Sequence, residues 1–319
     1  MNLFKSVIIV LSLSLIFSAC SAPSSPTQEQ VQPESIHIVV TSDYGREILV
    51  EQTLPYSPNL NALAALQQVA SIETAYGGGF VKGINGLSSS YHKSSSGRDD
   101  WFFYINGMMS NTGALDYNLH NGDTEYWDFH DWSFQKFNPA VIGLLPEPFL
   151  HGFRGQLDST IVAYSDDLEA EAQSLERLLA SFDITPLTTR PVDDLSQSEK
   201  ESGNLVLIGT QDTALISEIN QQWKRLGFFA NFSAGKLITF NSNGQQSAEY
   251  TSATGLIEAT QNPWNPDGTG ACENVVWLIT GTDAVGVRSA VDFLCQNTAD
   301  LRFACAAVIT QEGITGLPQ

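Results

Sequence analysis

Residues 101–127, WFFYINGMMSNTGALDYNLHNGDTEYW, decide how the first part of this chain folds. Residues 101–105 are aromatic and β-branched, and such side chains fit the half-buried surface of a strand. The Asn106-Gly107 dipeptide tolerates positive φ and predicts a tight turn. We expect a short second element at residues 113–117 and a third strand at residues 124–129. Short aromatic strands with glycine at their turns make either a plain β core or the wall of a site for a large flat ligand.

Alternation along the first of these strands divides its aromatic side chains between two faces. Successive residues of a strand point to opposite sides, so Trp101 and Phe103 share one face and Phe102 and Tyr104 share the other. We expect only one of those faces to belong to the core. The other face would then be free to meet a ligand.

The chain begins with features of an exported lipoprotein. Residues 1–19 form a predicted signal peptide, with Lys5 before an apolar run at residues 7–16 that is too short for a mature membrane span. Small residues directly before Cys20 resemble the bacterial lipobox, and the resemblance implies a lipid anchor on Cys20 at the extracytoplasmic face of the cell envelope. Residues 20–35 are rich in proline and lack aromatic side chains, which predicts a disordered tether.

The chain is strongly acidic. It has 15 Lys and Arg against 35 Asp and Glu, a net charge of −20. Removal of the signal peptide takes Lys5 and no acid, so the mature charge is 14 − 35 = −21. Nucleic acid and anionic lipid bind positive surfaces, so this charge argues against both as partners. Solubility of an exported protein explains the charge by itself.

We expect residues 36–135 to form an α+β domain. Alternating apolar residues predict strands at residues 36–41 and 47–51. Leucines and alanines at helical spacing predict a helix at residues 59–70, and residues 80–86 predict a further short strand. The sum is one helix packed on a small, mostly antiparallel sheet.

The order of four motifs in this domain carries a family resemblance. GFVKGING at residues 79–86 and WFFYING at residues 101–107 are followed by GALDY at residues 113–117 and GDTEYW at residues 122–127. This order resembles the transcobalamin-like C-terminal domain of bacterial surface proteins, which is related to the smaller domain of intrinsic factor and transcobalamin. In those proteins the domain lies over one face of cobalamin. The resemblance covers residues 36–132, under a third of the chain.

The resemblance implies a site for a corrinoid or a similar large flat ligand. Carried over position by position, the implied ligand-binding residues are Trp101, Phe103, Gly113, Ala114, Leu115 and Tyr117. A corrin is broad and apolar with a fringe of amides, so aromatic faces and backbone hydrogen-bonding groups suit it. Intrinsic factor and transcobalamin close a large helical barrel over cobalamin, and this sequence has no such barrel.

After a proline-containing linker at residues 136–157, we expect an α/β domain at residues 158–319. Three apolar strands are each followed by a tight turn and an amphipathic helix, which predicts a mainly parallel sheet flanked by helices. The predicted strands lie at residues 160–164, 205–208 and 275–280, the helices at 168–182, 213–226 and 284–295, a hairpin-like insert at 236–257 and a last strand at 303–310. Segments of this domain faintly resemble prokaryotic surface-layer proteins.

Three cysteines follow the predicted anchor. In an exported protein they predict one disulfide and one free thiol, with Cys295–Cys305 and Cys272–Cys305 as alternative pairings. Their spacing does not match a zinc site, because there is no CxxC and no histidine after residue 151.

The sequence contains none of the motifs GxSxG, HExxH, GxGxxG and GKS/T. We therefore expect a binding protein and not an enzyme, with no required cofactor and no metal. The leading expectation is a lipid-anchored extracytoplasmic protein that binds cobalamin, another corrinoid or a similar large flat ligand, with a membrane transporter as candidate partner. The alternative is a structural or adhesive cell-surface module that binds an envelope protein or a glycan and whose aromatic residues fill a core.

Overall fold

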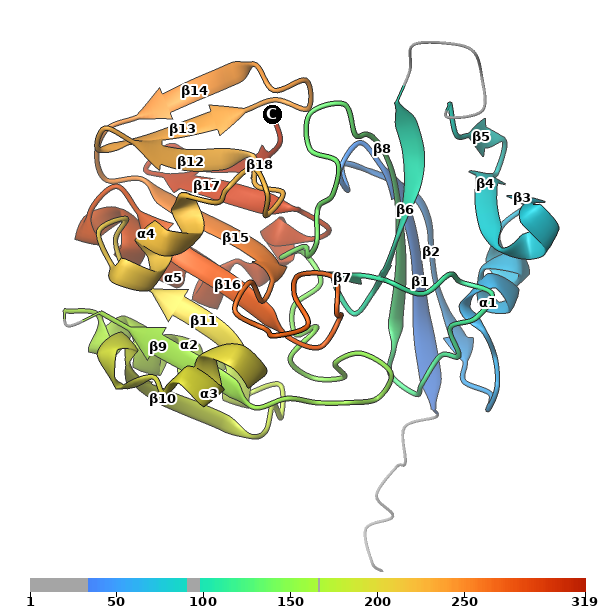
Figure 1. The fold of residues 1–319 in the computed structure, drawn as a ribbon, viewed down its shortest axis with the longest axis horizontal. Coiled ribbons are helices and arrows are strands. Elements are labelled where there is room, and N and C mark those ends of the chain that lie inside the picture. Colours follow the sequence, from blue (N-terminus) through green and yellow to red (C-terminus); the bar gives the residue numbers. More distant parts are fainter. Residues whose placement is uncertain (1–33, 91–97, 166) are drawn as a thin grey trace, which may run out of the picture. The chain divides into compact units, whose positions relative to one another are not determined.

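The computed structural model describes residues 34–90, 98–165 and 167–319. Residues Glu34–Gln319 form one compact unit. Within the described residues the chain is a mixed α/β protein with several sheets and five α-helices (Figure 1). The predicted signal peptide, Cys20 and most of the predicted tether lie outside the described residues.

The first sheet has five strands. In spatial order they are β2 (Glu47–Pro55), β1 (Ser35–Ser42), β8 (Thr124–Asp131), β6 (Asp99–Ile105) and β7 (Met108–Met109). Only the β1–β8 pair is parallel; the other neighbouring pairs are antiparallel. The strands at residues 101–105 and 124–129 and the turn at Asn106-Gly107, where both residues have positive φ, are as the sequence predicted.

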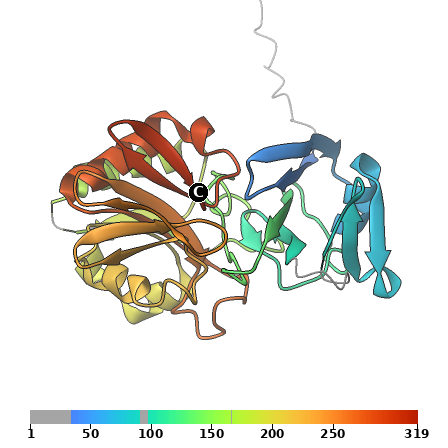
Figure 2. The same cartoon turned by 90° about the horizontal axis from the view of Figure 1, so that it is seen from above.

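One face of the first sheet is covered by α1 (Ala62–Val69) and a small second sheet (Figures 1 and 2). That second sheet consists of β3 (Ile72–Ala75), β4 (Phe80–Ile84) and β5 (Leu87–Ser88), and a short 3₁₀ turn (Tyr76–Gly78) joins β3 to β4. The helix begins later than predicted because Asn61 is its N-cap, with its side chain accepting a hydrogen bond from the Ala64 N–H at 2.8 Å.

Both faces of β6 are buried, which corrects the expectation that only one would be core. Trp101 and Ile105 pack in the cluster that contains α1. Tyr104, on the opposite face, is only 1% exposed and packs in a second cluster. The strand is therefore sandwiched, and an open ligand face cannot be inferred from alternation alone.

The second large sheet has seven strands. In spatial order they are β10 (Leu187–Pro191), β9 (Thr160–Tyr164), β11 (Asn204–Ile208), β16 (Val275–Gly281), β15 (Gly255–Gln261), β17 (Ala306–Thr310) and β18 (Gly313–Leu317). The first four are parallel, whereas β15, β17 and β18 pair antiparallel. The prediction of a mainly parallel sheet thus holds for one half of it. The other half is antiparallel because Gly255–Ile257, which the sequence pattern placed in the hairpin-like insert, begin the fully buried strand β15. This strand pairs antiparallel with both of its neighbours, β16 and β17.

Helices cover both faces of the parallel half. Buried side chains of α2 (Glu169–Ala180) and α5 (Ala284–Gln296) pack with Val162, Val206 and Ile279 on one face. The short helix α4 (Ala214–Asn220) packs with Leu205, Leu207 and Leu278 on the other. Strands buried on both faces explain the continuous apolar runs in the sequence. The remaining elements are α3 (Gln197–Ser202), two further 3₁₀ turns (Val192–Asp194 and Thr298–Leu301) and a three-stranded sheet of β12 (Ala230–Ser233), β13 (Lys236–Phe240) and β14 (Gln246–Tyr250).

The two large sheets share a hydrophobic cluster, which we call the junction core. It combines Val39, Tyr104 and Tyr126 of the first sheet with side chains that include Leu256 and Val308 of the second. The segment after β8 reinforces this contact through the backbone, because the N–H groups of residues 142 and 143 both donate to the carbonyl of residue 304.

Cys272, Cys295 and Cys305 are all free thiols, so the predicted disulfide is wrong. Cys305 belongs to the junction core, whereas Cys295 packs on the side of the sheet that α5 covers. The seven-stranded sheet therefore lies between these two thiols. The Cys272 thiol instead donates to the Met109 carbonyl at 3.1 Å.

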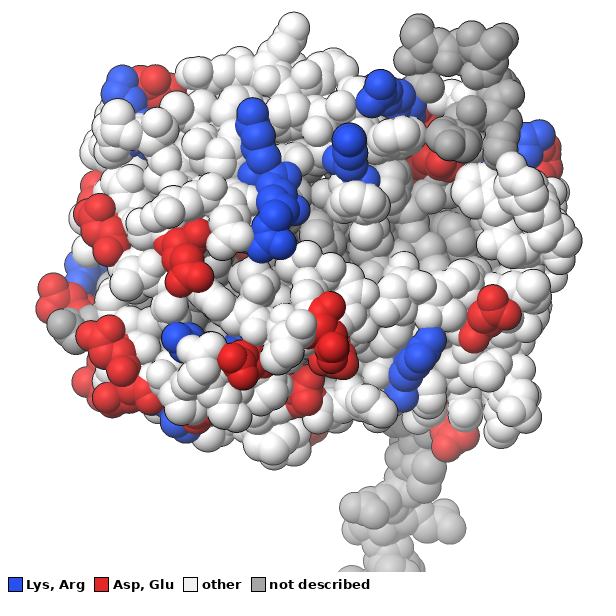
Figure 3. Space-filling view, in the orientation of Figure 1, with Lys and Arg blue, Asp and Glu red and all other residues white. Residues whose placement is uncertain are grey.

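Charged side chains are scattered over the visible surface with wide uncharged areas between them (Figure 3). Within the described residues, no helix has both the length and the apolar character needed to cross a membrane.

Candidate functional site

An uncharged pocket opens on the face of the first sheet that α1 and β4 also cover. Its volume is about 330 Å³. Strands β6 and β8 supply its floor, the loop after β7 and the turn into β4 supply its walls, and Phe137 stands at its edge. The lining residues are Gly78, Gly79, Phe80, Val81, Trp101, Phe102, Phe103, Met109, Ser110, Asn111, Thr112, Gly113, Ala114, Trp127 and Phe137. We call this cavity the apolar pocket.

The floor is built by strand register. Phe103 lies opposite Trp127 in the antiparallel β6–β8 pair, and their rings stack with centroids 4.7 Å apart. Trp101 lies opposite Phe129, and these rings are 5.0 Å apart. Facing aromatic pairs of this kind stabilise a sheet. The Phe103 and Trp127 rings are stacked at 24°, whereas the Trp101 and Phe129 rings are tilted by 54°.

Glu125 fixes the indole of Trp127. The Trp127 Nε1–H donates to Glu125 Oε1 at 2.7 Å, and both side chains are buried. Burial raises the pKa of Glu125 well above its usual range, which favours the neutral carboxyl. The floor thus contains a polar anchor and still presents no charge to the pocket.

Trp101 is largely a packing residue. Its side chain is 7% exposed, and its Nε1–H donates to the Leu87 carbonyl at 3.0 Å. Phe103 is half-buried and leaves more of its ring open to the pocket. Of the two strand residues implied by the resemblance, Phe103 therefore has the greater capacity to touch a ligand.

The implied turn residues are divided between the pocket and its surroundings. Residues 113–117 form a turn and not the expected short element, because the Tyr117 N–H donates to the Gly113 carbonyl at 3.1 Å. Gly113 and Ala114 line the pocket. Leu115 is 40% exposed and lies outside the lining, beside Gly78.

Tyr117 also lies outside the lining. It is 1% exposed, its ring packs against Phe153 with centroids 5.1 Å apart, and its hydroxyl accepts from the Arg154 N–H at 2.9 Å. The structure therefore brings four of the six implied residues to one pocket: Trp101, Phe103, Gly113 and Ala114.

Sequence reasoning missed several residues of the pocket. Trp127 could have been found by pairing the two aromatic strands, because it lies directly across from Phe103. Met109 and the 59% exposed Phe137 had no such signal, since long-range packing alone brings them to the pocket.

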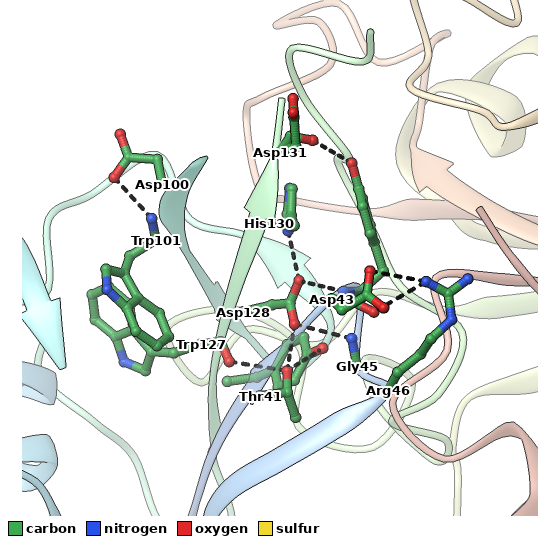
Figure 4. Close-up of polar contacts among 12 residues, drawn as sticks. Thr41, Asp43, Gly45, Arg46, Asp100, Trp101, Trp127, Asp128, His130 and Asp131 are labelled. Atoms are coloured by element: carbon green, nitrogen blue, oxygen red, sulfur yellow. Dashed lines mark hydrogen bonds and ion pairs between the residues drawn. The ribbon is translucent and has the colours of Figure 1, made fainter. Parts of the chain in front are cut away.

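The opposite face of β8 carries a buried polar cluster. Asp128 accepts hydrogen bonds from Thr41 Oγ1 at 2.6 Å and from the Tyr44 and Gly45 N–H groups, and its other partner is His130 Nδ1 at 2.6 Å. Figure 4 shows Trp101 and Trp127 on one side of the strand pair and this cluster on the other.

The His130 ring is stacked between two other rings, Tyr44 at 4.2 Å and Phe102 at 4.0 Å between centroids. Asp128 and His130 are 2% and 4% exposed, so this pair has no route to a substrate. In the part of the chain that the structure describes, no three His, Cys, Asp or Glu side chains gather closely enough to hold a metal ion.

A protein-family model matches part of the chain. Residues 59–131, which span α1 to β8, match the family model described as "Domain of unknown function (DUF4430)". This match covers the pocket except for Phe137. No curated protein matches the chain significantly.

Two solved structures are similar to about a third of the chain, 31% in each case. The first is haptocorrin in complex with Cbi, with a TM-score of 0.26, 16% identity and coverage of 31% of this chain. The chain spans about a quarter, 25%, of that haptocorrin chain. The second is a candidate metal binding protein from Ruminococcus gnavus ATCC 29149, with a TM-score of 0.24, 16% identity and coverage of 31% of this chain and 97% of the other.

Proposed function

We propose that this chain is an extracytoplasmic binding protein that captures a corrinoid, or a similarly flat and uncharged ligand, on the apolar pocket. One observation carries the proposal: among the described residues, the pocket lining contains no Asp, Glu, Lys or Arg, although the chain has 50 such residues, 15 basic and 35 acidic. A lining of aromatic rings and glycine backbone favours a neutral ligand with a broad apolar face.

The geometry suits contact with part of a large ligand. The stacked Phe103 and Trp127 rings offer a flat surface, and half-buried Met109 and exposed Phe137 add apolar contacts beside it. The loop at residues 110–113 brings backbone groups to the same edge, where amide substituents of a corrin could hydrogen-bond. A pocket of about 330 Å³ holds one face or edge of such a ligand and leaves the rest in solvent.

The site resemblance described from the sequence supports the same ligand class, because four of its six implied residues meet in this pocket. Contact on one face predicts weaker binding than a clamp that closes on both faces, since less surface leaves water. We therefore expect affinity in the micromolar range, and passage of the ligand to a membrane transporter would require such reversible binding.

The test is a titration of the mature protein with cyanocobalamin and with cobinamide, followed by corrin absorbance and by quenching of tryptophan fluorescence. Phe103→Ala should weaken binding at least about tenfold, because it removes the open ring of the floor. The matched control is Phe182→Ala, which removes a half-buried ring that lies outside the pocket lining. Absence of binding by both corrinoids at high micromolar concentration would refute the proposal.

We also propose that the protein is anchored in the envelope through Cys20, supported by the apolar run and small residues that precede it. Cells that express the full chain should incorporate labelled fatty acid into it and keep it in the membrane fraction. Cys20→Ala should abolish the label and release the protein; a label that persists in this variant would contradict the anchor.

A further inference from the structure

Gln261, at the last position of β15, is bonded to two segments that build the apolar pocket. Its side chain is 1% exposed. Its Nε2 donates to the Met109 carbonyl at 2.9 Å and to the Pro139 carbonyl at 3.1 Å. Its Oε1 accepts from the Gly270 N–H at 2.9 Å and from the Cys272 N–H at 3.0 Å. All four hydrogen-bonding positions of this buried amide are therefore occupied.

Two of these partners belong to the pocket or adjoin it. Met109 lines the pocket, and Pro139 follows two residues after Phe137 at the pocket edge. The Met109 N–H also donates to the Pro139 carbonyl at 2.9 Å, so the two segments are already paired with each other. Gln261 ties that pair to the seven-stranded sheet.

The loop at residues 270–272, whose Gly270 and Cys272 N–H groups donate to Gln261 Oε1, also contacts the pocket wall. Asn111, a lining residue, donates from Nδ2 to the Gly270 carbonyl at 3.0 Å and to the Ala271 carbonyl at 3.1 Å. The Cys272 thiol donates to the same Met109 carbonyl that Gln261 holds. The second large sheet therefore supports one wall of the pocket through a set of hydrogen bonds that converges on Gln261.

We propose that Gln261 is a positioning residue that holds Met109 and Phe137 in place in the lining of the apolar pocket. This role gives the seven-stranded sheet a part in ligand selection, although none of the pocket-lining residues comes from that sheet. The identity of the ligand in this inference rests on the proposed function. The positioning role itself rests only on the hydrogen bonds of Gln261. Only an amide suits the position, because it offers two donors and an acceptor with two lone pairs, whereas a carboxylate keeps the acceptor and loses the donors.

The test compares Gln261→Glu with a matched control, Asn262→Asp. Asn262 is the next residue, is also 1% exposed, and donates from Nδ2 to the Lys200 and Gly203 carbonyls at 2.7 and 3.4 Å. Both substitutions remove an amide donor that serves two buried carbonyls. The control differs in that neither Lys200 nor Gly203 lines the pocket.

The first readout needs no ligand. Amide hydrogen exchange of the peptide that covers residues 106–116 should rise about tenfold in Gln261→Glu and stay unchanged in Asn262→Asp. Equal exchange in this peptide for the wild type and Gln261→Glu would overturn the positioning role whether or not a corrinoid binds.

The second readout is ligand affinity. Gln261→Glu should weaken cyanocobalamin binding about tenfold relative to the wild type, and Asn262→Asp should not, although both lower the melting temperature. Failure of the wild type to bind would refute the proposed function and leave the exchange result to decide the role of Gln261. Equal weakening in both variants would show a general loss of stability and would overturn the inference.

Discussion

The two faces of the β6–β8 strand pair are both rich in aromatic residues but differ in how far those residues are buried. On the pocket face, the Phe103 and Trp127 rings are stacked and Trp101 packs against Phe129 at a tilt, and these side chains border a cavity whose described lining is uncharged. On the junction face, Tyr104 and Tyr126 are buried together with the Asp128–His130 pair. The difference arises from what covers each face, since the second large sheet closes one and leaves the other partly open.

The comparison shows that aromatic content does not identify a ligand surface. The junction face has hydroxyl, carboxyl and imidazole groups, yet all are buried, so it stabilises the fold. The pocket face has fewer polar groups, but half-buried Phe103 can still exchange contact with water for contact with a ligand. The two faces therefore differ in the exposure of their side chains and not in their aromatic content.

The largest expected effect tests whether Trp101 belongs to the fold or to the ligand. Trp101→Ala should lower the free energy of unfolding by about 3–5 kcal/mol, because it leaves a cavity in the core and removes the hydrogen bond to Leu87. Urea unfolding followed by circular dichroism measures the loss. A loss below about 1 kcal/mol combined with lost ligand binding would move Trp101 to the ligand surface.

The junction face is tested by Asp128→Ala. The change leaves donors from Thr41, Tyr44 and Gly45 without a buried acceptor, and each such donor costs roughly 1–3 kcal/mol. We expect a total loss of about 3 kcal/mol, with corrinoid affinity unchanged in the folded protein. A variant of normal stability that no longer binds the ligand would reverse the roles of the two faces.

A pH experiment measures the cost of polar burial on the junction side. Glu258, two residues after Leu256 on the same side of β15, is 4% exposed, and its Oε2 has no hydrogen-bond partner among the described residues. Burial raises its pKa well above the usual 4.5. The folded protein therefore keeps the proton that the unfolded chain releases, and stability present below pH 4.5 is lost as the pH rises towards the folded-state pKa.

Glu258→Gln should remove this loss. The variant should match the wild type near pH 4 and exceed it by about 1.4 kcal/mol for each pH unit above 4.5, until the folded-state pKa is reached. Denaturant unfolding at pH 4, 6 and 8 checks the trend. Glu125 has the same direction of shift but is unchanged in both proteins, so it cancels in the difference. A difference that does not depend on pH would contradict a neutral Glu258.

The smallest expected effect concerns Leu115. Because its side chain is 40% exposed and outside the pocket lining, Leu115→Ala should change stability by less than about 0.5 kcal/mol and leave ligand affinity unchanged. A tenfold loss of affinity on titration with cyanocobalamin would extend the pocket to the turn that carries this residue.

Local patterns predicted much of the first sheet. The run at residues 101–105, the Asn106-Gly107 turn and the strand that ends the quoted stretch depend on neighbours in sequence, and the structure has all three. The parallel strands β9, β11 and β16 followed from their continuous apolar runs. These features need no knowledge of distant partners.

The predictions from the sequence were wrong where contacts between residues far apart in the chain determine the structure. The antiparallel course of β15 depends on its place between β16 and β17, and the free thiols depend on which side of that sheet each cysteine occupies. In the site, Met109 and Phe137 come together through long-range contacts: the Met109 N–H and the Gln261 amide both donate to the Pro139 carbonyl. A single sequence carries no local signal for such contacts.

Gly143 has a consequence for any attempt to divide this protein. A Cβ at Gly143 would lie 2.2 Å from the backbone nitrogens of Phe303 and Ala304, so the connecting segment is pressed against the far end of the chain. The matched family region, residues 59–131, is thus only part of a larger folding unit. An expressed fragment that ends near residue 135 would place Tyr104 and Tyr126 in water, and we expect it to aggregate. Because the first sheet packs against the second large sheet, insertions or domain exchanges at residues 136–157 should be poorly tolerated.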